Sequence, residues 1–107
     1  MIENRPWSEV FAQAGEAWAD AEAAASLLED CKSAVLAEMC ARLGDIAVNR
    51  AEQSVKASPE WREYIEKMVE ARHQANLARV KMEATRMKFN EWQSKEANDR
   101  QEMRMVS

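Results

Sequence analysis

Apolar and small residues recur every three or four positions through two long runs of this sequence. The first run reads Trp7, Phe11, Ala14, Trp18, Ala21, Ala25, Leu28, Val35, Met39 and Ile46, and the charged Lys32 and Arg42 interrupt it at two positions where apolar residues would be due. The second run reads Tyr64, Met68, Ala71, Ala75, Ala78, Met82, Thr85, Phe89 and Trp92. Alternating steps of four and three form the heptad pattern of helices that pack along one face. Only two glycines and two prolines occur, too few for a fold with many tight turns. The pattern therefore predicts an all-α protein with two long helices.

A short break separates the two runs. Ser58 can cap the free amides at the start of a helix, and Pro59 has the backbone torsion of a first helical residue. Glu60 then suits the positive end of the helix dipole. We therefore expect a long antiparallel, coiled-coil-like hairpin whose turn lies near Ser58 and Pro59.

The length of the chain allows one domain. Gly44 weakens a helix by about 1 kcal/mol relative to alanine, so we expect the first helix to stop or kink there. If the segment after it docks as a separate short helix, the register of the hairpin must shift by about a turn. The expected organisation is one helical domain over residues 1–107, with a first helix over about 7–47, a weakly packed connector over 48–58 and a second helix over 59–103.

Charged residues beside the runs predict how the two helices align. Arg72, Arg79 and Arg86 follow one another at heptad spacing, and Glu22 and Glu29 hold the equivalent flanking position in the first helix. Folding the chain about residue 54 places Glu29 beside Arg79 and Glu22 beside Arg86. An exposed pair contributes only about 0.3–0.5 kcal/mol, so we expect these pairs to set the register more than the stability.

The residues in the middle of the predicted seam are small, whereas aromatic residues gather at its open end. Alanine permits close approach of two helices but buries little apolar area, so a lone hairpin would be marginally stable. We therefore expect a homodimer that forms a four-helix bundle. We also expect a protein partner to bind at the open end, through Trp7, Phe11, Trp18, Phe89 and Trp92.

No group of residues has the pattern of a catalytic site. His73 is the only histidine, and neither cysteine is expected on its face of the helix, so no nucleophilic triad or dyad can be built. Glu70 and His73 have the spacing of a ligand pair in di-iron helical bundles, but the heptad pattern turns both away from the seam. With Gly15 and Gly44 as the only glycines, there is no glycine-rich phosphate loop. We expect no enzymatic activity, no cofactor and no metal.

Charge is distributed unevenly, which bears on nucleic acid as a partner. The net charge is −4; residues 1–47 hold nine acids and three bases, a net of −6, and residues 48–107 hold ten acids and twelve bases, a net of +2. Basic helical stripes near aromatic residues can bind a phosphate backbone. DNA or RNA binding is thus the alternative to protein binding, through Arg72, Arg79, Lys81, Arg86 and Lys88.

Features of the chain that report on its compartment favour the cytoplasm. Cys31 and Cys40 are nine residues apart in one predicted helix, too far for a disulfide, and we expect both to be reduced. The N-terminus lacks the basic region and apolar run of a signal peptide. No apolar stretch approaches the roughly 20 residues that span a bilayer. We expect a cytoplasmic protein without membrane contact.

The segment from Lys81 to Arg100, KMEATRMKFNEWQSKEANDR, resembles the C-terminal part of small helical proteins encoded by phages and prophages. Some proteins of that kind lie near recombination genes. The resemblance implies a non-enzymatic accessory role, either in DNA recombination or in blocking a host nuclease or defence complex. The acidic first helix suits an inhibitor, because an acidic surface can compete for a DNA-binding groove.

Overall fold

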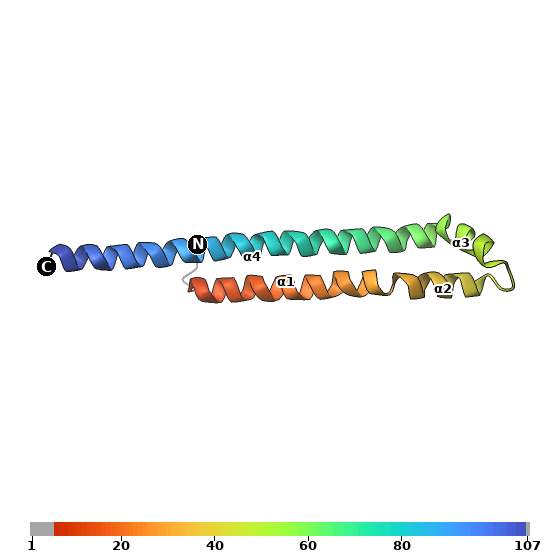
Figure 1. Cartoon of the computed structure of the whole chain (residues 1–107), viewed down its shortest axis with the longest axis horizontal. Helices are drawn as coiled ribbons and strands as arrows, with labels where there is room; N and C mark the ends of the chain where they lie inside the picture. Colours follow the sequence, from red (N-terminus) through yellow and green to blue (C-terminus); the bar gives the residue numbers. More distant parts are fainter. Residues whose placement is uncertain (1–5, 107) are drawn as a thin grey trace.

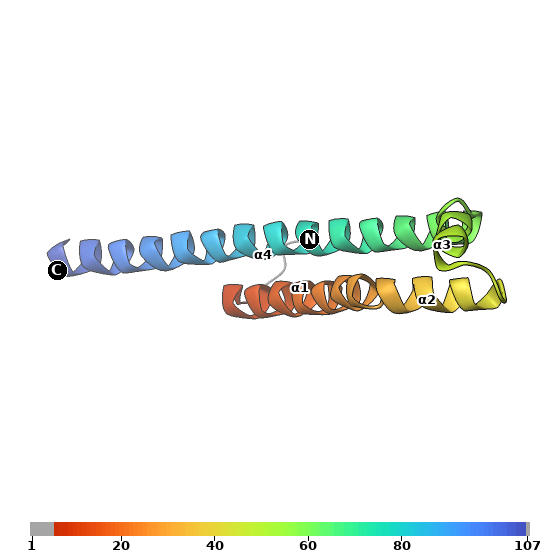
Figure 2. The same cartoon turned by 45° about the vertical axis from the view of Figure 1, so that its right-hand side comes forward.

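The computed structural model describes residues 6–106, which form an elongated hairpin of 86 × 26 × 16 Å without any strand (Figure 1). The chain runs out along two helices, turns, and returns along one short helix and one very long one. These are α1 (Trp7–Asp30), α2 (Lys32–Arg42), α3 (Val48–Lys56) and α4 (Pro59–Val106). Figure 2 shows that α4 stays beside α1 when the molecule is turned, so the two helices pack along their length. The all-α hairpin that the heptad runs predict is confirmed.

The outgoing limb is two helices where one helix over residues 7–47 was expected. Pro6 precedes α1 and accepts hydrogen bonds from the amides of Glu9 and Val10 at 3.0 and 3.1 Å. A break at Cys31 separates α1 from α2, although helical hydrogen bonds flank it: Cys31 N to Leu27 O at 3.0 Å, and Val35 N to Cys31 O at 2.9 Å. No glycine or proline lies at the break, which coincides with Lys32, a charged residue in the apolar series.

The outgoing limb ends at Gly44. Its φ of 84° lies in the left-handed region, where a residue without a Cβ terminates a helix at little cost. The Gly44 amide donates to Ala41 O at 3.2 Å, which satisfies one of the last carbonyls of α2. The helix therefore stops at this glycine, one of the two outcomes expected from the sequence.

The chain reverses at residues 43–47 and not near Ser58 and Pro59 as expected (Figure 1). The reason is α3, which packs against both α2 and the start of α4. The segment after Gly44 is therefore a separate short helix, the alternative left open from the sequence, and its Ala51 and Val55 are buried. Their spacing of four residues gives α3 an apolar side that needs a neighbouring helix.

The start of α4 follows the sequence expectation. The Ser58 hydroxyl accepts a hydrogen bond from the Trp61 amide at 3.2 Å and donates to Val55 O at 2.5 Å. Ser58 thus caps α4 and holds the end of α3 with the same oxygen. Pro59 is the first helical residue and Glu60 lies in the first turn.

The seam between α1 and α4 forms one part of the core, and the buried Ala51, Val55 and Trp61 form the other part, around α3. Ala25 and Ala75 are fully buried in the seam, and Thr85 is buried with its hydroxyl donating to Lys81 O at 2.8 Å. The remaining α1 and α4 residues of the two heptad runs are half-buried, except Trp92, which is 45% exposed. Ile46, which the first run includes, is exposed because it falls in the reversal. Two small residues therefore stand at the centre of a thin core.

Beyond the start of α1, α4 continues without another helix of residues 6–106 beside it (Figures 1 and 2). We call residues 93–106 the C-terminal overhang. All of its residues are exposed except Glu96, which is half-buried. The overhang is helical to Val106, three residues further than the sequence expectation.

Candidate interaction surfaces

Arg72 of α4 joins the two limbs on one side of the seam. Its Nε and Nη2 donate to the two carboxylate oxygens of Glu29 at 2.9 and 2.7 Å, and its Nη1 donates to Glu22 at 2.6 Å. The hydrogen bond from Arg72, with its positive charge, lowers the pKa of Glu29, and the bonds to Glu29 and Glu22 raise the pKa of Arg72. A planar guanidinium that meets a carboxylate with two bonds fixes orientation better than a single bond does.

This arrangement corrects the predicted register. Glu29 and Glu22 are the acids expected at the seam, but both pair with Arg72 rather than with Arg79 and Arg86. The shift follows from the reversal at residues 43–47, which moves the centre of the hairpin toward the N-terminus. Tyr64 confirms the observed register, because its hydroxyl donates to the carbonyl of Leu28.

The predicted aromatic cluster forms in part. The rings of Phe11 and Phe89 lie 6.4 Å apart and those of Phe89 and Trp92 lie 6.2 Å apart, at the open end of the hairpin. Trp7 and Trp18 are half-buried along α1, and no ring contact within residues 6–106 includes either of them. The corrected register places Trp18 near the middle of the seam, so only part of the expected surface is brought together.

The basic residues proposed for nucleic acid lie on different sides of α4. Arg72 is engaged with Glu22 and Glu29, and Arg79 and Arg86 follow it at heptad spacing along that flank of the seam. Lys81 lines a groove on the other flank, with Lys88 one heptad beyond. The five cations therefore do not form a single stripe.

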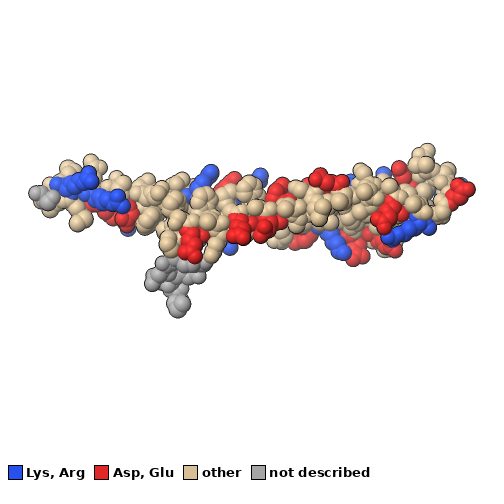
Figure 3. Space-filling model, turned by 90° about the horizontal axis from the view of Figure 1, so that it is seen from below, with Lys and Arg blue, Asp and Glu red and all other residues tan. Residues whose placement is uncertain are grey.

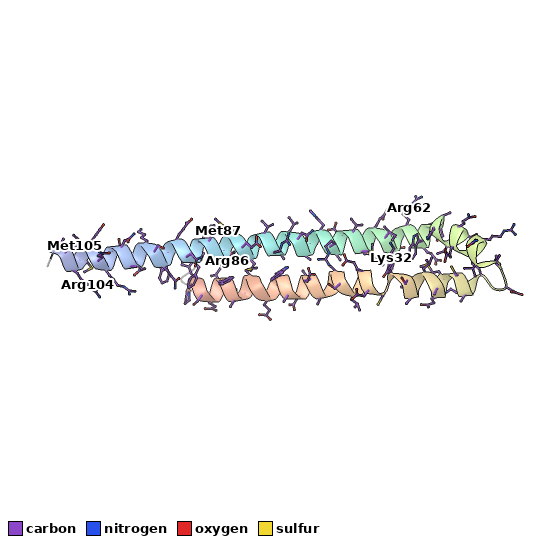
Figure 4. All side chains as sticks on the ribbon, viewed as in Figure 1. Lys32, Arg62, Arg86, Met87, Arg104 and Met105 are labelled. Carbon is purple, nitrogen blue, oxygen red and sulfur yellow. The ribbon has the colours of Figure 1, made fainter. Side chains whose placement is uncertain are left out.

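The side of α4 away from α1 carries apolar residues that sequence reasoning missed. Val69, Val80 and Met87 are each more than half exposed. Steps of eleven and seven residues complete whole helical turns, so the three lie on one side of α4. Figure 4 shows Met87 pointing away from α1. We call these residues the outer stripe. Their helical spacing is visible in the sequence, but it lies outside the predicted seam.

The side of α1 away from the seam is acidic. Between Trp7 and Asp30 the chain has six acids and no base. Two of them, Glu22 and Glu29, pair with Arg72, which leaves Glu9, Glu16, Asp20 and Asp30. Acidic side chains predominate where α1 faces the viewer in Figure 3.

Glu70 and His73, the pair considered for metal binding, are both exposed on α4. Glu70 accepts a hydrogen bond from Gln74 at 2.8 Å, and His73 is exposed. No group of three or more metal-binding side chains occurs in the part of the chain that the structure describes. Cys31 and Cys40 are both free thiols. None of the helices between residues 6 and 106 has the length and apolar character to cross a membrane.

No family model, no curated protein and no solved structure matches this chain.

Proposed function

We propose that this protein is a non-catalytic accessory protein that works by binding other protein chains, a second copy of itself among them. The main support for this proposal is the large area of surface that the single chain exposes. The chain exposes 8513 Å², whereas a compact monomer of 12.2 kDa exposes about 6,100 Å². The excess of roughly 2,400 Å² is what one chain of an extensive, permanent interface buries.

The shape of the molecule supports the same proposal. The radius of gyration is 23.8 Å, whereas a compact domain of this length has about 13 Å. A long hairpin with a thin seam has few buried contacts to oppose the conformational entropy of the unfolded chain. Homodimerisation into a four-helix bundle would enlarge the core without lengthening the chain.

The outer stripe is the surface that we assign to a different protein. Val69, Val80 and Met87 are apolar and exposed along one side of a rigid helix, and methionine adapts to partners of varied shape. An amphipathic helix of the partner could lie along this side. The half-buried Phe11 and Phe89, with exposed Trp92, offer a second contact at the open end.

A phage or prophage setting is part of the proposal, with two roles in view. The protein would either assist DNA recombination or inhibit a host nuclease or defence complex. The acidic α1 favours the inhibitor, because a row of carboxylates on a rod resembles the charge of a nucleic acid to a basic groove.

Nucleic-acid binding through Arg72, Arg79, Lys81, Arg86 and Lys88 is the alternative function. The engagement of Arg72 and the placement of the others on two flanks weaken it. A binder of this kind loses affinity steeply with added salt. A fluorescence titration with single- and double-stranded DNA and RNA at low and high salt would reveal it.

The function is tested by affinity capture from a lysate of the source organism, with and without nuclease. We expect a captured protein that survives nuclease treatment and is lost when Val80→Asp and Met87→Asp are combined. Met105→Asp with Val106→Asp is the matched control, since these residues are more exposed but lie in the overhang. Capture of nothing, or capture that nuclease abolishes, would contradict the proposed function.

A further inference from the structure

Two residues of the outer stripe belong to a continuous apolar row on the side of α4 away from α1. Leu77, Val80, Ala84 and Met87 follow one another at steps of three, four and three residues. This is the spacing at which a helix packs along another helix, and all four side chains are exposed. We call these four residues the apolar row. It gives α4 a second face for helix packing, opposite the seam with α1.

The two borders of the apolar row differ in charge. Residues that directly follow or precede the row positions in sequence form its borders on the helix. One border holds Lys81 and Lys88, one heptad apart, and the other holds Asn76, Glu83 and Asn90. Both lysines are exposed, and neither forms an ion pair with another residue between 6 and 106. An occupant of the row therefore meets two unpaired cations along one border.

We propose that the apolar row binds an amphipathic helix of a different protein, with carboxylates along the border that faces Lys81 and Lys88. This inference rests on the proposed function, and it names the chemistry of the partner that the outer stripe binds. Apolar residues of the partner at steps of three and four would pack between the two borders. The row from Leu77 to Met87 is about 15 Å long, so it matches roughly three turns of the partner helix.

A second copy of this chain fits the apolar row poorly. On α1, Glu9 and Glu16 hold the outer heptad position that Val80 holds on α4. Docking of that side would place carboxylates over the apolar row and not beside the lysines. An antiparallel pair of α4 helices would bring Lys81 and Lys88 of one copy beside those of the other. A different protein, with apolar residues in the middle and acids at the border, avoids both conflicts.

Two synthetic helical peptides test the chemistry of the partner. Each has three heptads with leucine at the seam positions, and the border positions are all glutamate in one peptide and all lysine in the other. Like charges at the borders keep each peptide from pairing with itself. In a fluorescence anisotropy titration at low salt, we expect the protein to bind the glutamate peptide with a Kd on the order of tenfold lower than that of the lysine peptide.

Charge reversal at the lysines should invert this preference. Lys81→Glu with Lys88→Glu presents two carboxylates beside the apolar row, so we expect the lysine peptide to bind this variant more tightly. Arg79→Glu with Arg86→Glu makes the same charge change on the flank of the seam and is the matched control, for which we expect the original preference. Circular dichroism on each variant checks that the helices are intact.

Removal of the apolar contacts separates the row from the charges. We expect Val80→Asp with Met87→Asp to abolish binding of both peptides. Duplex DNA that binds through Lys81 and Lys88, but is indifferent to Val80→Asp with Met87→Asp, would show that the lysines serve nucleic acid and would overturn the inference. Loss of a homodimer in the same double variant would show that a second copy covers the row, and would also overturn it.

The peptide results can fail without the proposed function. No binding of the glutamate peptide, or a preference that survives Lys81→Glu with Lys88→Glu, would overturn the acidic partner helix. Capture of a protein from the lysate through Val80 and Met87 would then still stand, with a partner of different chemistry. Failure of the capture experiment contradicts the proposed function itself.

Discussion

At the scale of single residues, the hairpin is aligned by one guanidinium. Arg72 reaches from α4 to two acids that lie seven residues apart on α1. A change of register by one heptad would leave Arg72 beside only one of them. The heptad pattern predicted both acids at the seam. It paired them with Arg79 and Arg86, however, which lie one and two heptads after Arg72.

Replacement of Arg72 tests this alignment. We expect Arg72→Met to lower the melting temperature more than Arg79→Met does, because Arg79 is exposed and forms none of these bonds. The predicted pairing of Arg79 with Glu29 would give the opposite order. Thermal unfolding followed by circular dichroism, at one protein concentration, measures both variants.

The pKa of Glu29 gives a pH-dependent prediction. Arg72 holds this pKa below its ordinary value of 4.5. The pair therefore contributes stability above the unfolded pKa, and the contribution disappears as the pH falls through the folded pKa. We expect Glu29→Gln to lower the free energy of unfolding at pH 7 and to have no effect near about pH 2. Urea titrations at both values would show this, and an equal loss at both would contradict it.

At the scale of elements, sequence patterns predicted the helices better than their arrangement. Ser58 caps α4 and Gly44 ends α2 because each signal acts on the local backbone. The docking of α3 stayed an open alternative at the level of sequence, because the burial of Ala51 and Val55 depends on α2 and α4. Once α3 docks, the reversal moves and every contact across the seam shifts with it. Most apolar residues of the seam were predicted correctly, with Ile46 and Trp92 as the exposed exceptions, but the residues opposite them were not.

Substitution of the two glycines by alanine should change the stability of the protein in opposite directions. Gly44 has a φ of 84°, so we expect Gly44→Ala to destabilise the protein by about 1 kcal/mol. Gly15 lies within α1, and a methyl group there meets nothing within 4 Å. We expect Gly15→Ala to stabilise by about 0.5–1 kcal/mol. Denaturant titrations of both variants measure the effects, and a destabilising Gly15→Ala would show that this position is covered by another chain or segment.

At the scale of the whole molecule, an 86 Å rod exposes more surface than a compact monomer of its mass. The excess lies on several sides: the groove beside Val10, Ala17 and Lys81, the outer stripe and the overhang. These surfaces differ in chemistry, so they suit different partners. The groove is lined mainly by small uncharged residues, the outer stripe is apolar, and the overhang is mostly polar.

Removal of the overhang should leave the bundle intact. Residues 93–106 are nearly all exposed and lie past the start of α1, so we expect a chain that ends at Trp92 to melt within a few degrees of the full chain. A chain that ends at Met82 loses Thr85 and Phe89 from the seam and should melt far lower. If the first truncation destabilises as much as the second, the overhang itself forms an interface.

Sedimentation equilibrium of the unmodified protein tests the central claim most directly. The chain mass is 12.2 kDa, and the proposed bundle predicts twice that mass at micromolar concentration. We also expect helicity to fall as dilution separates the two copies, because the single hairpin has a thin core. A mass of one chain, with helicity unchanged across the dilution, would contradict the account.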